Sequence, residues 1–196
     1  MKTLVVVAHP RTDSLTSKIT ERFTAGLCEA GHEYEIADLY AEGFNPLLFP
    51  QDEPDWDNPN KVYSDEVLRE MNRIQASDAL VFIFPVWWYS MPAILKGYFD
   101  RVWNYGFAYG GATLPVQKIR WIALVGVTQD QFEKRSYHLM MQHHLNVGFA
   151  GYCGVEDSKV HFIYNTLAEF DESLQEKYEN HFVNLLNEAH QIGHTF

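Results

Sequence analysis

Three aromatic residues follow one another in a predicted loop: Trp87, Trp88 and Tyr89. They come after Ala79–Phe84, whose length and content of β-branched and aromatic residues are typical of a buried strand. Pro85 should end that strand because it has no N–H to donate, and Pro92 suits the first turn of a helix. Loops at the carboxyl ends of strands bind ligands in open α/β sheets, and three large rings there cannot all join a core. We therefore predict a binding site for a flat aromatic ligand.

The stretch His9–Thr16 contains the residues of an anion site. It follows the apolar run Thr3–Ala8, which predicts a central strand, and it holds Ser14, a good N-cap for the next helix. Main-chain N–H groups and the dipole at a helix start favour negative charge, and nearby hydroxyl groups add donors. The stretch has neither the Gly-Lys-Ser/Thr of a P-loop nor a GxGxxG turn. On these residues alone, ordinary N-capping by Ser14 is as good an explanation as an anion site.

A third loop lies further along the chain. Lys118–Val127 predicts a strand, and Gly126–Asp130 would offer small residues and a hydroxyl group where that strand ends. The helix predicted next carries Tyr137, His143 and His144. His143 and His144 should not share a metal ion, because adjacent residues on a helix point in different directions.

The bulk composition limits the class of protein. The chain has 196 residues, of which 46% are hydrophobic, so residues 1–196 are expected to form one domain with a full core. The formal charge of −11 argues against nucleic acid or an anionic membrane surface as a partner. Two cysteines are too few for a disulfide framework or a metal cluster. Without a run of about 18 apolar residues, no membrane insertion is expected and a cytoplasmic location is the default.

Strands and helices alternate along the sequence. Such alternation predicts an α/β fold, and five strands in this length favour a flavodoxin-like parallel sheet of order 2-1-3-4-5 with helices on both faces. The loops His9–Thr16, Pro85–Tyr89 and Gly126–Asp130 then meet at one end of the sheet. A phosphate tail joined to a flat ring would fill all three loops, which describes a flavin nucleotide. The remaining predicted segments are a strand Tyr34–Leu39, a helix after Ser64, a helix from Pro92 to Gly106, a helix across Tyr137–Val147, a strand within Tyr152–Ile163 and a helix Leu167–Ile192.

Three motifs resemble one family. AHPRTDSLT, DLYAEGFNP and above all FPVWWYSMPAILKGYFDRVWNYGFAYG are similar to the NAD(P)H:quinone oxidoreductases with a flavodoxin-like fold, over a stretch from Met1 to about Ile163. Members of that family are homodimeric flavoproteins that carry FAD or FMN. They include quinone reductases and the ancillary subunits of glutathione-gated potassium efflux systems.

The resemblance implies roles for particular residues. The flavin phosphates would be held by His9, Ser14, Leu15 and Thr16. The isoalloxazine would be lined by Pro85, Val86, Trp87, Trp88 and Tyr89, and faced by Gly126, Val127, Thr128 and Gln129. Where the family usually has Thr-Thr-Gly-Gly, this chain has Gly-Val-Thr-Gln. The sequence therefore leaves open whether the main chain of this loop comes as close to the flavin ring as it would with two glycines. Tyr137 and His143 match a catalytic pair beside the flavin, where a phenol can donate a hydrogen bond to a negatively charged ring and a histidine can take up charge near neutral pH. The alternative for His143 is a surface or interface histidine. Phe107 and Tyr109 match a flap over the substrate, for which plain loop packing is the alternative.

The function implied is a flavin-dependent NAD(P)H oxidoreductase. It would reduce quinones or related electron-poor aromatics by two-electron hydride transfer with ping-pong kinetics. The alternatives are a regulatory ancillary subunit that docks on a membrane potassium transporter, and a flavodoxin-type one-electron carrier. The DLYAEGFNP motif and the chain length favour FAD, with FMN as the alternative, and the residues do not choose between NADH and NADPH. A homodimer is expected, and three alternating aromatic residues suit an interface: Trp103, Tyr105 and Phe107.

Overall fold

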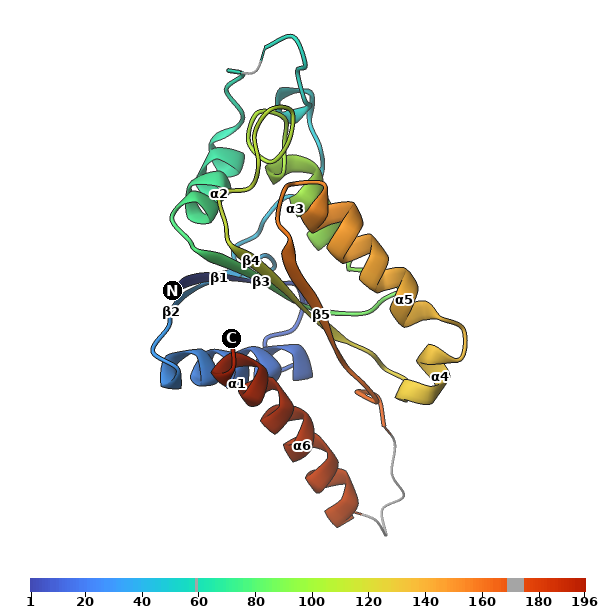
Figure 1. The fold of residues 1–196 in the computed structure, drawn as a ribbon. Helices are drawn as coiled ribbons and strands as arrows, with labels where there is room; N and C mark the ends of the chain where they lie inside the picture. Colours follow the sequence, from blue (N-terminus) through green and yellow to red (C-terminus); the bar gives the residue numbers. More distant parts are fainter. Residues whose placement is uncertain (59, 169–174) are drawn as a thin grey trace.

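The computed structural model describes residues 1–58, 60–168 and 175–196. Its centre is a five-stranded parallel sheet of order β2-β1-β3-β4-β5 (Figure 1). The predicted strand order is therefore confirmed. The strands are β1 Lys2–Val7, β2 Glu33–Asp38, β3 Ala79–Pro85, β4 Lys118–Leu124 and β5 Asp157–Ile163.

Helices cover both faces of the sheet. Figure 1 shows α1 and α6 together on one face and α2, α3 and α5 on the other. The described helices are α1 Leu15–Glu29, α2 Asp65–Gln75, α3 Ala93–Val102, α4 Gln129–Glu133, α5 Tyr137–Gln142 and α6 Gln175–His194, with a 3-10 turn η1 Pro50–Asp52 and a π-helical segment η2 His143–Gly151.

The central strands are buried on both sides because alternate side chains feed two cores. Val5, Val81 and Ile122 pack with α1 and α6. Leu80 and Phe82 belong to the other core, under α2 and α3. This two-sided burial explains why the strands read as continuous apolar runs, and it holds their carboxyl ends in one row.

Two helix starts follow the predicted capping. The Ser14 side chain accepts a hydrogen bond from the Ser17 main chain at the start of α1, and Ser64 does the same for Val67 at the start of α2. Each serine satisfies one of the N–H groups that a first helical turn leaves without a partner. The predicted N-caps are confirmed.

Several predicted boundaries were wrong. The predicted β4 strand ran to Val127 but ends at Leu124, and the helix predicted to reach Gly106 ends at Val102. Gln129 and Asp130, expected in a loop, form the first turn of α4 because Thr128 caps it. Leu167, expected to begin the last helix, lies in a turn, and part of that predicted helix falls outside the described residues.

The long helix expected across Tyr137–Val147 changes character within its length. It is α-helical in α5 and then continues as the π-helical segment η2, which ends at Gly151. A π-helix is rare and often lies near a functional site. No feature of the apolar pattern signalled the change.

Trp103 is not available for an interface. Its side chain is 6% exposed and packs against Phe82, Phe99, Trp121 and Phe149. Its expected role as a dimer contact is corrected: the chain leaves α3 just before Trp103, which turns the ring into the core. Within the described residues, no helix combines the length and apolar content needed to span a bilayer.

Candidate functional site

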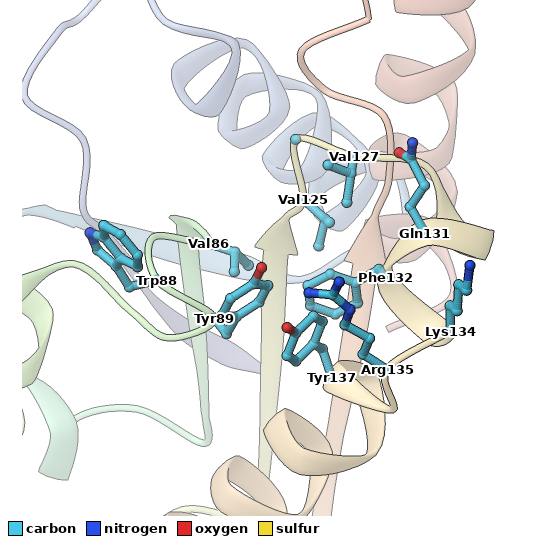
Figure 2. Close-up of a pocket in the computed structure, with 11 residues that line it drawn as sticks. Val86, Trp88, Tyr89, Val125, Val127, Gln131, Phe132, Lys134, Arg135 and Tyr137 are labelled. Carbon is cyan, nitrogen blue, oxygen red and sulfur yellow. The ribbon is translucent and has the colours of Figure 1, made fainter.

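A cavity of about 510 Å³ opens at the carboxyl ends of β3 and β4. That volume lies in the range of pockets that hold small organic ligands. Figure 2 shows its side chains coming from the β3–α3 turn, the end of β4, and the α4–α5 region. It is lined by Val86, Trp88, Tyr89, Val125, Gly126, Val127, Gln131, Phe132, Lys134, Arg135 and Tyr137.

The turn after β3 presents the three predicted rings. Trp87 and Ser90 exchange main-chain hydrogen bonds of 3.0 Å in both directions. The residues between them, Trp88 and Tyr89, have φ of 52° and 58°, as a two-residue type I′ turn requires. Trp88 is 95% exposed and the other two rings are each more than 40% exposed. The prediction that these rings stand outside the core is confirmed.

Tyr89 and Tyr137 form the centre of the cavity. Their rings lie nearly parallel, with centroids 3.7 Å apart and an interplanar angle of 19°. Hydrogen bonds from Arg135 and from Tyr89 lower the pKa of Tyr137, while the same Tyr137 contact raises the pKa of Tyr89. Phe132 supports the Tyr137 ring from behind, at a centroid distance of 5.7 Å.

The start of α1 lies beside this turn. The His9 ring is 6.4 Å from the Trp87 ring, and the Arg11 main chain donates to His9 Nδ1 at 3.1 Å. Among the described residues, no acceptor is found for the main-chain N–H groups of Leu15 and Thr16. Free N–H groups at the positive end of a helix are suited to an anion. The predicted anion turn and the predicted ring loop are therefore neighbours.

The loop after β4 agrees only in part with expectation. Gly126 and Val127 line the cavity. Thr128 instead caps α4, and Gln129 donates to Glu133 at 2.9 Å on that helix. A Cβ at Gly126 would lie 2.8 Å from Leu167 Cδ1, so glycine allows the close passage of the chain there.

Several predicted site residues do not line the cavity. His143 is exposed at the start of η2 and does not line the cavity. Phe107 is also absent from the lining, and Tyr109 lines a second hollow of about 440 Å³ together with Tyr152 and Trp103. Pro85 is the last residue of β3, paired with Leu124. The catalytic role of His143 and the flap role of Phe107 and Tyr109 stay predictions.

Sequence reasoning missed the residues that α4 and the two positions after it bring to the cavity. Gln131, Phe132, Lys134 and Arg135 all line it. The signal was present as a capping box, because Thr128 and Gln131 have the Ser/Thr-x-x-Glu/Gln spacing that marks a helix start. In the described part of the chain, no group of three or more His, Cys, Asp or Glu side chains is placed to hold a metal ion.

The sheet order and the ligand loops at its carboxyl edge define a flavodoxin-like α/β protein. Residues 1–185 match the family described as having a flavodoxin-like fold, and the chain belongs to that family.

Known relatives carry oxidoreductase names. A protein of Escherichia coli named an uncharacterized NAD(P)H oxidoreductase is 43% identical over 175 residues, which is 89% of each chain. The solved NAD(P)H:quinone oxidoreductase from Methanothermobacter marburgensis is 31% identical, with a TM-score of 0.85 over 99% of this chain and 94% of that one. NAD(P)H dehydrogenase [quinone] 1 of Rattus norvegicus is 36% identical over 129 residues, 58% of this chain and 46% of the rat protein.

Proposed function

We propose that this protein is an NAD(P)H-dependent oxidoreductase that uses a flavin nucleotide to reduce quinones or related electron-poor aromatics. The observation that carries the proposal is the aromatic cavity around Tyr89 and Tyr137, whose β3–α3 turn lies beside the start of α1 through the rings of Trp87 and His9. The names of the relatives point to the same reaction class.

The residues fit a flavin nucleotide. The first turn of α1, with Ser14, Leu15 and Thr16, would hold a phosphate group through main-chain N–H groups. Among the described residues, no acceptor is found for the N–H groups of Trp88 and Tyr89, because the I′ turn uses only its outer residues. Those two donors suit the polar edge of a flat heterocycle. A flavin so held supplies the hydride acceptance and donation that no side chain can perform.

The side chains have three tasks in this proposal. Val86, Val125 and Phe132 form an apolar wall that keeps water from the reacting rings. The Trp88–Tyr89 turn orients the ring system. Tyr137 can donate a hydrogen bond to negative charge that develops in the cavity.

The overall reaction balances with one proton from solvent. NAD(P)H gives up a hydride, which carries two electrons, and a quinone gains that hydride and one proton to become a quinol. The nicotinamide and the quinone would occupy the cavity in turn, which gives ping-pong kinetics. FAD is the proposed nucleotide, and either NADH or NADPH can be the donor.

The test is anaerobic reduction of the flavin-loaded protein. Addition of NADPH or NADH should bleach the visible absorbance band of the oxidised flavin, and a quinone added next should restore it. Mass spectrometry of the released cofactor identifies FAD or FMN. Protein that retains its flavin but shows no bleaching with either nicotinamide would contradict the proposal.

A homodimer is also proposed. Apolar side chains stand exposed around the second hollow: Trp56 is 68% exposed and Tyr152 is 69% exposed, beside Tyr109. Exposed aromatic clusters of this kind are typical of protein interfaces. Sedimentation should give twice the mass of one chain, and monomer alone at micromolar concentration would refute it. The transporter subunit, the one-electron carrier and the cytoplasmic location stay predictions from the sequence.

A further inference from the structure

Tyr137, one of the two tyrosines that line the cavity, has an arginine beside it. Sequence comparison suggested His143 as the partner of Tyr137, but six residues on a helix rotate the side chain by about 240°, and His143 is exposed outside the cavity lining. Arg135 lines the cavity, and Figure 2 shows its guanidinium group beside the Tyr137 phenol. Hydrogen bonding from Arg135 is the largest cause of the lowered pKa of Tyr137.

We propose that Arg135 is the positioning residue of this site, and that it takes the role expected of His143 by holding the Tyr137 hydroxyl and placing a permanent positive charge beside it. The proposal rests on the proposed reductase function and names a residue that the function alone does not require.

Arg135 can act on the Tyr137 hydroxyl group in only one direction. A guanidinium group has donors and no acceptor, so its hydrogen bond must run from Arg135 to the phenol oxygen. That bond lowers the pKa of Tyr137 and leaves the Tyr137 hydrogen for a ligand. Tyr137 thus becomes a stronger donor toward negative charge in the cavity.

The charge of Arg135 is not cancelled nearby. Within the described residues, no carboxylate lies within 4.0 Å of the Arg135 guanidinium or of the Lys134 ammonium. Glu133, the acidic residue next in sequence, is engaged by Gln129 and Tyr164. The titratable groups around Tyr137 are therefore Tyr89, Lys134 and Arg135, with Tyr164 and Glu133 behind Phe132.

A histidine and an arginine predict different pH behaviour. A histidine loses its charge as the pH rises through about 6.5, whereas an arginine stays charged. With Arg135 in this role, hydride transfer should stay constant across that interval and change only when Tyr137 ionises. A loss of rate as the pH rises through the histidine range, removed by His143→Gln, would overturn the assignment.

The direct test needs no cofactor. The ionisation of Tyr137 is followed in the apoprotein as the tyrosinate absorbance that Tyr137→Phe removes. Arg135→Gln should raise the midpoint of that titration by about one pH unit, and Arg135→Lys should recover part of the shift. The matched control is Lys134→Gln, which removes the same charge from the neighbouring residue and should shift the midpoint less. An unchanged midpoint in Arg135→Gln, or equal shifts in both variants, would refute the proposal.

Kinetics of the loaded enzyme supply the second readout. Arg135→Gln should lower kcat about tenfold with little change in the KM for NADPH, because the lost interaction acts on developing charge. A change confined to KM would contradict the proposed role. If the wild-type protein fails to reduce its flavin, the proposed function falls, whereas the apoprotein titration still decides the role of Arg135.

Discussion

Tyr89 and Tyr137 stack face to face across the cavity, with 3.7 Å between their ring centroids. They come from elements that are distant in sequence: Tyr89 from the turn after β3, and Tyr137 from the first position of α5. The contact requires Tyr89 and its neighbour Trp88 to adopt positive φ, a conformation that costs about 1–2 kcal/mol for a residue with a side chain. The turn therefore holds its rings in place at some expense in stability.

Trp88→Gly should stabilise the apoprotein and weaken flavin binding. Glycine adopts positive φ freely, and the Trp88 side chain is 95% exposed, so little burial is lost. We expect a gain of about 1 kcal/mol in the free energy of unfolding, measured with urea. Flavin affinity, measured by fluorescence quenching, should fall about tenfold with the lost ring contact.

Trp88→Ala is the matched control for the backbone effect. It removes the same ring but keeps a Cβ at positive φ, so it should weaken flavin binding without a gain in stability. Equal stability of the two variants would contradict strain at this turn.

Asp52→Asn should lower the free energy of unfolding, because it breaks a buried ion pair. Asp52 and Arg101 are 1% and 2% exposed, and their Oδ2 and Nη2 atoms lie 2.8 Å apart. Burial alone would raise the pKa of Asp52, but hydrogen bonds from Ser64 and Arg101 outweigh it and hold the pKa below its usual value. Loss of the Asp52 charge leaves the buried Arg101 with the partly exposed Glu66 as its remaining carboxylate partner, so we expect a cost of about 3 kcal/mol in the free energy of unfolding, at the low end for a broken buried pair.

The exposed pair Lys96 and Asp100 is the control for that prediction. Their side chains are 51% and 44% exposed, so Asp100→Asn should change stability by less than about 1 kcal/mol. The stabilisation from Asp52 should also fade in acid, as the pH falls through its lowered pKa, since an unfolded aspartate takes up the proton first. Similar urea midpoints for Asp52→Asn and Asp100→Asn would refute a structural role for the Asp52–Arg101 pair.

The fold could be predicted because its signals are local and repeated. Each buried strand is a short apolar run, and Ser14 and Ser64 mark helix starts by a side chain that bonds three residues ahead. A parallel sheet of five such units has few allowed strand orders. The ring loop was predictable for the same reason, since Trp88 and Tyr89 stand out between a strand and a helix.

The remaining features depend on contacts between distant residues. Asp52 and Arg101 are 49 positions apart, and nothing local to either predicts their pairing. Trp103 looked like a surplus ring because the end of α3 could not be located, and that end decides which way the ring points. Arg135 was missed because it directly follows α4, whose five residues are too few for an apolar period to show.

The two cysteines should differ sharply in reactivity. Cys28 is exposed, whereas Cys153 is 4% exposed and burial raises the pKa of its thiol to about 11. The thiolate is the reactive form of cysteine. Cys153 should therefore be unreactive for two reasons: its burial keeps reagents away, and its raised pKa keeps the thiol protonated. Ellman's reagent at about pH 8 should label one thiol in the native protein and both in guanidinium chloride. In Cys28→Ser the native protein should show no rapid labelling; rapid reaction of a second thiol would contradict the burial of Cys153.

His161 should make the protein less stable in mild acid. Burial, and then the charges of Lys159 and Arg120, lower the pKa of His161 to about 4. An unfolded histidine binds its proton at a pH of about 6.5, so between about pH 6.5 and 4 the unfolded chain holds more protons than the folded one. The free energy of unfolding should therefore fall as the pH decreases through that window and level off below it.

His161→Gln should remove this part of the pH dependence, as followed by urea unfolding at a series of pH values. The difference in unfolding free energy between wild type and variant is the quantity to follow, because it cancels the contributions of the other histidines. A difference that stays constant from neutral pH to about pH 4 would show that His161 takes up its proton equally in both states.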